Sequence, residues 1–180
     1  TFRASIARKA ILAYQVDIIN DVSGGKDPEM FHTIAELHTP YILTHMRGTP
    51  ETMTTMTDYQ NLLAEIIDFF QRRVDTLHQM GVSDIILDPG FGFAKTTEQN
   101  FKLLSNIHAL QVFGLPILVG LSRKSMFIRT LDVTPQSSSA LTATIVGNTI
   151  ALQQGAAILR VHDVREAKDT ITIYTNCSCV

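Results

Sequence analysis

The chain has 180 residues, a length that suits one globular domain. Hydrophobic residues make up 45% of it and charged residues 18%, which excludes wholesale disorder. The net charge of −2, from 15 Lys and Arg against 17 Asp and Glu, argues against a nucleic-acid or anionic-membrane binder.

Helical and strand patterns alternate along the chain. The first pattern is helical, because apolar residues share one face between Ile6 and Tyr14. Short runs rich in Ile, Leu and Val then predict five buried parallel strands, at 17–20, 41–46, 84–88, 116–120 and 157–162. Apolar residues at helical spacing predict helices between them, at about 27–37, 62–77, 101–107 and 137–155. This alternation indicates βαβ units and an α/β fold.

The ends of the strands distinguish two α/β architectures. The strand spacing fits part of a (β/α)8 barrel and equally a complete flavodoxin-like open sheet. An open sheet concentrates its site at one switch point, whereas a barrel takes side chains from the carboxyl ends of several strands. Here every predicted strand ends in polar groups, namely Asn20 and Asp21, His45 and Arg47, Asp88, Ser122–Ser125, and Arg160–Asp163. We therefore predict an incomplete (β/α)8 TIM barrel with about five of its eight strands.

Asn20 and Asp88 suit the recognition of a nitrogen heterocycle. A carboxylate accepts two N–H groups from an amino-pyrimidine edge, and an amide offers both a donor and an acceptor. Asp21 has two interpretations, since its carboxylate would serve equally well to tie off the loop after its strand.

The stretch Asp88–Lys95 is rich in glycine but matches no nucleotide-binding fingerprint. Gly90 and Gly92 let the backbone approach a ligand, and Phe91 and Phe93 offer flat faces for stacking. We expect one of the two phenylalanines to pack on the barrel rim instead.

Two further motifs indicate an anion site. Ser122–Ser125 combines hydroxyls and cations directly before a predicted helix, whose free N–H groups attract an anion or a carbonyl. Arg160 and His162 alternate along the last predicted strand, so both should point to one side and suit a phosphate or pyrophosphate. The alternative for each is a charge pair with a neighbour such as Asp163. The histidines form no H-x-H or H-E-x-x-H motif, so no metal ligands are predicted.

Five strings of residues, in chain order, resemble the dihydropteroate synthase family: Asp17–Gly25, Thr44–Gly48, Leu87–Phe93, Gly120–Ser125 and Arg160–Val164. The resemblance spans nearly the whole chain and implies a (β/α)8 barrel that lacks strands one to three here. The start inside a helical pattern, without Met, agrees with a missing N-terminal piece. We expect a pterin-binding domain over residues 1–175 and a tail over 176–180. In the family, the first-strand loop supplies an Asn that helps hold the magnesium pyrophosphate, and this sequence has no substitute for it.

The resemblance implies a transferase of folate biosynthesis. In that family 6-hydroxymethyl-7,8-dihydropterin pyrophosphate is joined to p-aminobenzoate, which gives dihydropteroate and pyrophosphate, and Mg2+ accompanies the pyrophosphate. By resemblance, Asn20, Asp88 and Lys124 are pterin ligands, and Gly120 lies beside the ring.

The resemblance also implies groups for the other parts of the substrates. Arg160 would stack on the pterin and reach the phosphates, and His162 would donate to the phosphates. The p-aminobenzoate pocket would be bordered by Phe93, Lys124 and Ser125. The expected catalytic residues are Asp88, Lys124 and Arg160.

Other functions stay open at this point. A methyltetrahydrofolate-binding barrel of a corrinoid methyltransferase also binds its pterin through an Asn and an Asp, but it has no pyrophosphate to hold. The Ser122–Ser125 and Arg160–His162 motifs therefore favour the synthase. A non-catalytic pterin-binding fragment would keep these residues without turnover. A flavodoxin-like nucleotide-binding module would instead cluster its site at one switch point.

Partners and location are predicted from a few features. Small residues on one helical stripe, Ala143, Gly147 and Ala151, allow close helix approach and a homodimer, although packing within the barrel explains them nearly as well. Cys177 and Cys179 lie at the end of the chain and cannot staple the fold, which indicates a reducing compartment, the cytoplasm. No signal peptide or membrane segment is predicted.

Overall fold

The computed structural model describes residues 1–49 and 51–178. It contains the five predicted strands, each shorter than predicted: β1 (Ile19–Asp21), β2 (Tyr41–Thr44), β3 (Ile85–Asp88), β4 (Leu118–Val119) and β5 (Ile158–Leu159). All pair in parallel, in the order β1-β2-β3 and β4-β5, and a parallel bridge between Leu87 and Ile117 joins the two sets. Parallel strands that neighbour one another in chain order are the arrangement of a (β/α)8 barrel.

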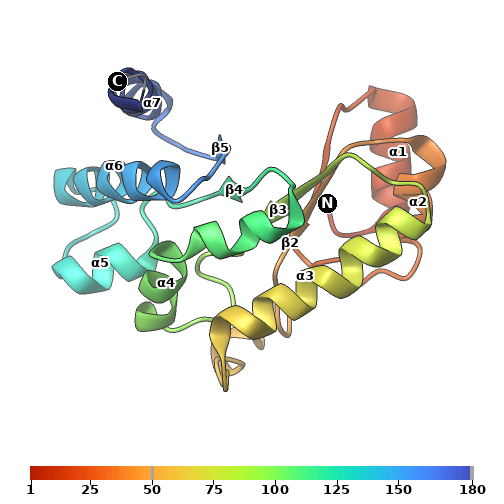
Figure 1. The fold of residues 1–180 in the computed structure, drawn as a ribbon, viewed down its shortest axis with the longest axis horizontal. Coiled ribbons are helices and arrows are strands. Elements are labelled where there is room, and N and C mark those ends of the chain that lie inside the picture. The colour runs from red at the N-terminus through yellow and green to blue at the C-terminus, as the bar shows by residue number, and fades with distance from the viewer. Residues whose placement is uncertain (50, 179–180) are drawn as a thin grey trace.

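Helices connect and cover the strands (Figure 1). The α-helices are α1 (Ala4–Tyr14), α2 (Met30–Leu37), α3 (Leu62–Gln79), α4 (Thr97–Leu104), α5 (Ser125–Leu131), α6 (Ser138–Gln153) and α7 (Val164–Ser178). Two 3-10 helices are η1 (Met53–Thr55) and η2 (Ile107–Phe113), so the helix predicted at 101–107 is in fact two elements. The tail predicted from residue 176 is helical through Ser178, and Cys179 lies outside the described residues.

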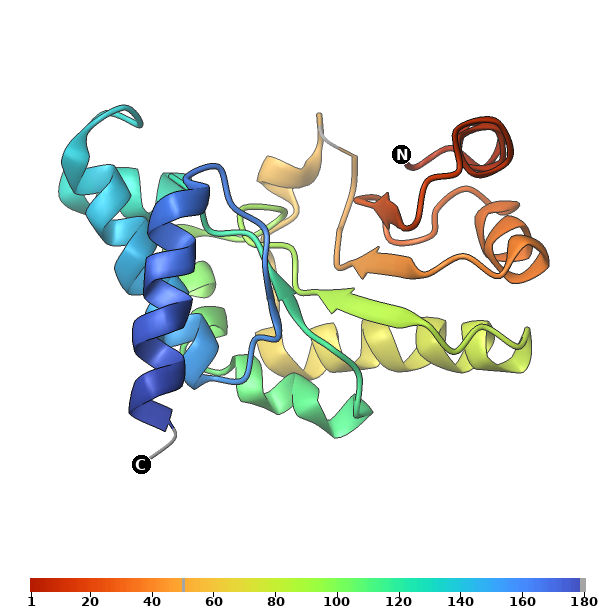
Figure 2. The ribbon, with the colours of Figure 1, turned by 90° about the horizontal axis from the view of Figure 1, so that it is seen from above.

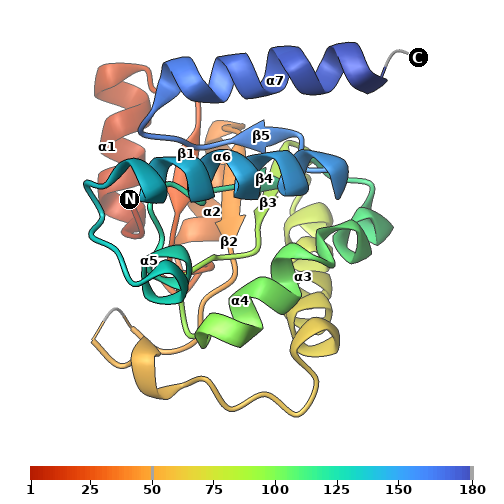
Figure 3. The same ribbon diagram turned by 90° about the vertical axis from the view of Figure 1, so that its left-hand side faces the viewer.

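The sheet curves without closing within the described part of the chain. β1 pairs only with β2, and β5 only with β4, so each has one free edge there (Figure 2). On the outside, α1 packs on α2 and α7 lies along α6 (Figure 3). In this same described part, no helix has both the length and the hydropathy needed to cross a membrane.

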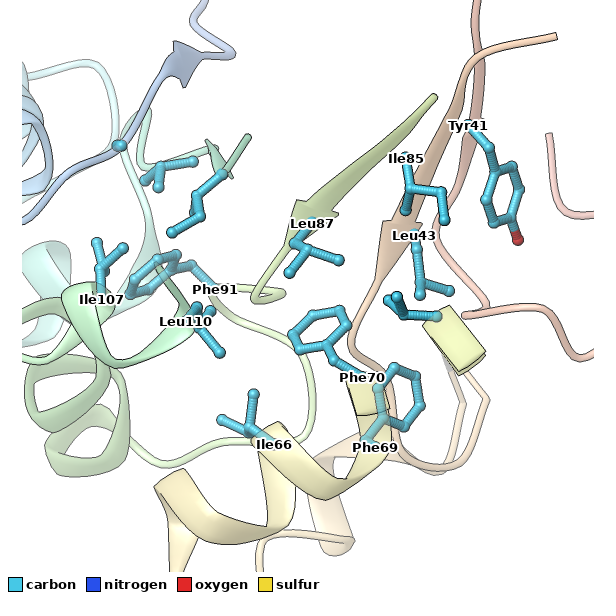
Figure 4. Packing of buried hydrophobic residues seen from close by; sticks show 14 of the residues in the cluster. Tyr41, Leu43, Ile66, Phe69, Phe70, Ile85, Leu87, Phe91, Ile107 and Leu110 are labelled. Atoms are coloured by element: carbon cyan, nitrogen blue, oxygen red, sulfur yellow. The ribbon is translucent and has the colours of Figure 1, made fainter. Parts of the chain in front are cut away.

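The core lies between the strands and the helices outside them. Leu43 of β2 and Leu87 of β3 are fully buried and face Phe70 of α3 (Figure 4). Because side chains alternate along a strand, the neighbouring Thr44 and Asp88 point to the opposite face, the inside of the barrel. These two residues are register partners, so they stand side by side on that inner face.

Asp21 serves the fold at the end of β1. It is fully buried, and its two oxygens accept hydrogen bonds from Ser23 N (2.7 Å), Ser23 Oγ (2.7 Å), Gly25 N (2.9 Å) and the hydroxyl of Tyr41 (2.6 Å). Burial, reinforced by Asp21, raises the pKa of Tyr41 well above its ordinary value, so Tyr41 stays a donor. Of the two interpretations of Asp21, the structure supports loop capping.

We predict that Tyr41→Phe lowers the free energy of unfolding by about 2 kcal/mol, because a buried carboxylate loses one of its donors. Urea denaturation measures this value. Tyr14→Phe is the matched control, since Tyr14 is 71% exposed, and its effect should stay within about 0.5 kcal/mol. Equal stabilities of the two variants would contradict the role given to the hydroxyl.

Candidate functional site

The polar residues predicted at the strand ends meet around one guanidinium. Nη1 of Arg160 donates to Oδ1 of Asn20 at 2.7 Å, and Nη2 lies 3.0 Å from Oδ2 of Asp88 in an ion pair. A Cβ at Gly120 would stand only 2.9 Å from Nη2, so the absence of a side chain there lets Arg160 lie across the inner face. The structure thus brings four of the predicted site residues together.

The sequence predicted that Arg160 and His162 alternate along one strand, but both lie beyond the end of β5. β5 ends at Leu159, and only the backbone N–H of Arg160 still continues the ladder, to the carbonyl of Val119 at 2.9 Å. Two residues later, the backbone N–H of His162 donates to the Ser122 hydroxyl at 3.0 Å. The short strand therefore leaves Arg160 over the inner face and places His162 beside the loop after β4.

Two polar atoms of the inner face, Nδ2 of Asn20 and Oγ1 of Thr44, have no hydrogen-bond partner among the described residues, and Oδ2 of Asp88 has only its ion pair with Arg160. Thr44 is fully buried, and Asp88 is 1% exposed. Buried polar groups in proteins are nearly always hydrogen-bonded, and exceptions concentrate where something else binds. A donor, a hydroxyl and a carboxylate oxygen on neighbouring strands fit a flat heterocycle with N–H and ring-nitrogen groups on its edge.

The loop after β3 divides its two aromatic residues between core and site. Phe91 is 2% exposed and packs in the core (Figure 4), as expected for one of the two. Phe93 is half-buried, and Nζ of Lys124 lies 5.2 Å from the centre of its ring. Burial lowers the pKa of Lys124, Asp88 opposes that shift, and Arg160 adds to it. A cation and an aromatic face thus stand together beside Asp88.

Lys95 is a buried group whose role the sequence did not reveal. It is 8% exposed, and its Nζ contacts Nδ1 of His45 (3.0 Å) and the carbonyl oxygens of Gly90 (3.0 Å) and Phe93 (3.1 Å). Burial lowers its pKa to about 7. Burial, with Lys95 as the nearest cation, also lowers the pKa of His45, so the neutral ring accepts a hydrogen bond from the lysine. In the sequence, only the position of Lys95 next to glycines and phenylalanines could have indicated that it is buried.

The motif before α5 is held by a different ion pair. The guanidinium of Arg123 binds both carboxylate oxygens of Asp163 (3.0 and 3.1 Å) and donates to the carbonyl of Pro135. Asp163, the example of a charge partner considered for Arg160 and His162, therefore pairs with Arg123, while Arg160 pairs with Asp88. Ser125, which begins α5, is exposed.

An open pocket lies next to this motif. It is lined by Ser122, Arg123, Pro135, Gln136 and His162. Its hydroxyl, guanidinium and imidazole groups suit an anion. In the part of the chain that the structure describes, no group of three or more His, Cys, Asp or Glu side chains could hold a metal ion.

Comparison with known proteins identifies relatives of this arrangement. The model of the pterin binding enzyme family matches residues 1–162. The dihydropteroate synthase of Synechocystis sp. is 44% identical over 167 residues, which are 91% of this chain and 57% of that protein. The structure of Yersinia pestis dihydropteroate synthase with a sulfonamide drug gives a TM-score of 0.94 at 34% identity, over 99% of this chain and 65% of that one. The Thermus thermophilus enzyme in complex with 6HMPPP gives 0.92 at 30% identity, over 98% and 70%.

These relatives settle the fold and the family. The solved neighbours are TIM barrels, so the predicted incomplete (β/α)8 barrel is confirmed. The chain spans little more than half the length of the curated relatives it matches, 57% of the Synechocystis protein and 55% of the Escherichia coli one. With a family match over most of its residues, the chain belongs to the pterin-binding enzymes.

Proposed function

We propose that this chain has the function of a dihydropteroate synthase, a transferase of folate biosynthesis. The reaction would join 6-hydroxymethyl-7,8-dihydropterin pyrophosphate to p-aminobenzoate and release pyrophosphate. The observation that carries the proposal is the convergence beneath Arg160 of Asn20, whose Nδ2 has no partner, and Asp88, whose Oδ2 has only its ion pair with Arg160. The 6HMPPP complex of the Thermus thermophilus relative supports the same substrate class.

Pterin recognition would begin with an exchange of partners. Asp88 and Asn20 are held by Arg160 in this structure, and the amino-pyrimidine edge of the pterin would replace it. Its N–H groups would donate to Asp88, while a ring nitrogen would accept from Nδ2 of Asn20. Lys124, near Asp88, would bind a further acceptor of the ring, beside Gly120. The displaced Arg160 would then be free to lie over the pterin and reach the phosphates.

The site supports substitution at the exocyclic methylene carbon of the pterin. The amine nitrogen of p-aminobenzoate bonds to this carbon, the bond to the pyrophosphate oxygen breaks with its electron pair on that oxygen, and the amine loses a proton to water. Asp88 would stabilise the positive charge that develops at the pterin, and Arg160 and His162 would stabilise the departing anion. Phe93, Lys124 and Ser125 would border the p-aminobenzoate. No covalent nucleophile is required.

Magnesium would come with the pyrophosphate. Mg2+ commonly keeps several waters and is bound through substrate phosphates with few protein ligands. This fits the described residues Ser122, Arg123 and His162, which line an open pocket with groups that suit a pyrophosphate. When bound, the ion would neutralise charge on the pyrophosphate.

Asp88→Asn should weaken the binding of 6-hydroxymethylpterin pyrophosphate, measured by calorimetry with magnesium, by about tenfold to a hundredfold. The carboxylate would lose the charge that accepts two N–H groups. Asp169→Asn, at an exposed position of α7, is the control and should bind as the wild type does. Equal affinity of the two variants would contradict the role of Asp88.

Turnover is measured separately, as pyrophosphate release after addition of p-aminobenzoate. Release supports the synthase. Binding without release would identify a non-catalytic pterin-binding chain, and the absence of binding by a folded wild type would overturn the proposal as a whole.

We also propose a cytoplasmic homodimer, whose interface would include part of the predicted stripe of small residues. Ala151 of this stripe is fully buried within the chain, whereas Ala143 and Gly147 line an apolar groove between α4, α5 and α6. The same groove includes Leu131 and Val146, which are 48% and 52% exposed. Exposed apolar grooves of this kind often mark protein interfaces, and a second copy is the simplest occupant.

Val146→Asp should shift the chain from dimer to monomer in sedimentation velocity, because a carboxylate would be desolvated at the interface. Val112→Asp, at a 73% exposed position of η2, is the control and should leave the sedimentation coefficient unchanged. A monomeric wild type would contradict the dimer.

A further inference from the structure

The turn between Asp88 and Lys95 is held by hydrogen bonds from the buried side chain of Lys95, the residue that ends it. Lys side chains are almost never fully buried unless they are paired, and Lys95 has no carboxylate at ion-pair distance among the described residues. Its ammonium has three donor hydrogens, and three acceptors surround it, two of them carbonyls of the turn itself. The backbone N–H of Phe93 also donates to the Gly90 carbonyl, at 3.1 Å, which closes the turn.

The turn holds a conformation that needs such support. Ala94 has a φ of +49°, in the left-handed region that residues with a Cβ rarely adopt. Gly90 has a φ of +70°, and a Cβ there would collide with the backbone carbonyl of His45. Backbone strain of this kind persists only where the surroundings over-determine it. Lys95 provides that constraint, together with Asn100, whose side chain accepts from Gly92 N at 2.8 Å.

The contacts of the turn continue directly into the site. The backbone N–H of Gly90 donates to Oδ1 of Asp88 at 2.8 Å, which fixes the carboxylate plane and aims Oδ2 at the inner face. At the other end of the turn, Phe93 stands beside Lys124. Lys95 therefore contacts both residues of the turn, Gly90 and Phe93, that fix the position of the pterin and p-aminobenzoate groups.

We propose that Lys95 is a positioning residue, whose buried amino group holds the turn 89–94 and, through it, the orientation of Asp88 and the place of Phe93. This inference rests on the proposed pterin-binding function, because it concerns the same site. Because Lys95 is 8% exposed and its Nζ contacts His45, Gly90 and Phe93, it would act through the turn. A purely structural lysine would affect stability alone, whereas a positioning residue changes ligand affinity in a chain that is still folded.

The test compares two variants of the full chain. Lys95→Met keeps the length of the side chain and removes all three donors. Leu77→Ala is the matched control, because Leu77 is fully buried near the end of α3, and its truncation costs about 2–5 kcal/mol without touching the turn. Both are titrated with 6-hydroxymethylpterin pyrophosphate and magnesium at a temperature where circular dichroism shows them folded. Backbone amide resonances of Gly90, Gly92 and Phe93 are recorded alongside.

Lys95→Met should lose affinity by about tenfold to a hundredfold, with shifted or broadened turn amides, while Leu77→Ala binds as the wild type does. Equal loss in both variants, or none in Lys95→Met, would overturn the inference and leave the proposed function standing. If the wild type does not bind, the proposed function fails. The positioning role of Lys95 is then tested by the backbone amide resonances alone. Unchanged turn amides in Lys95→Met would then contradict the positioning role, and changes confined to the turn would support it.

The pH dependence of stability gives a second, independent check. The charged or titratable groups that act on Lys95 are Asp88, which favours its charge, and His45, Arg47 and Lys124. With a pKa of about 7 against an ordinary 10.5, Lys95 binds fewer protons in the folded chain than in the unfolded chain between these values. Its stability contribution is therefore greatest at high pH and is lost as the pH falls toward 7.

The free energy of unfolding of the wild type, relative to Lys95→Met, should thus rise between about pH 7 and about pH 9.5. Urea denaturation of both chains at several pH values measures the difference. A difference that stays constant with pH would contradict a buried, titrating ammonium.

Discussion

The contacts of one guanidinium determine the state of the whole inner face. Arg160 and Asn20 are 140 positions apart in the chain, yet a hydrogen bond joins them, while the same side chain forms an ion pair with a nearly fully buried Asp88. A carboxylate removed from water requires partners, and Arg160 forms its ion pair while the N–H of Gly90 donates to its other oxygen. Gly120 is part of this arrangement, since any side chain there would push the guanidinium away.

Much of the fold was readable from the sequence because it follows from apolar runs. Buried parallel strands and amphipathic helices leave local patterns, and every predicted strand is present in the structure. Where a strand ends is a different matter. β5 stops at Leu159 because the backbone N–H of His162 leaves the sheet and donates to the Ser122 hydroxyl. Ser122 lies in a loop 40 residues earlier in the chain, and no local sequence pattern predicts this hydrogen bond.

In the site, too, the sequence indicates which residue types are present but not which partners they contact. That Asn20, Asp88 and Arg160 lie together could be predicted, because their places at strand ends are visible in the sequence. That Asp163 pairs with Arg123, or that Asp21 accepts from Tyr41, depends on contacts formed only in the folded chain. Burial of Lys95 was unreadable for the same reason, since a charged residue after a glycine-rich stretch is normally expected at the surface.

His45 connects this site to the aromatic core. Its ring accepts a hydrogen bond from Lys95 on one side and lies edge-to-face against Phe69 of α3, with ring centres 4.7 Å apart, on the other. Phe69 in turn packs against Phe70 at 5.4 Å. A shift of these rings would move the acceptor of a lysine that holds the ligand-facing turn. Under the proposed function, substitutions in the interior of α3 would therefore change ligand affinity through His45 and Lys95.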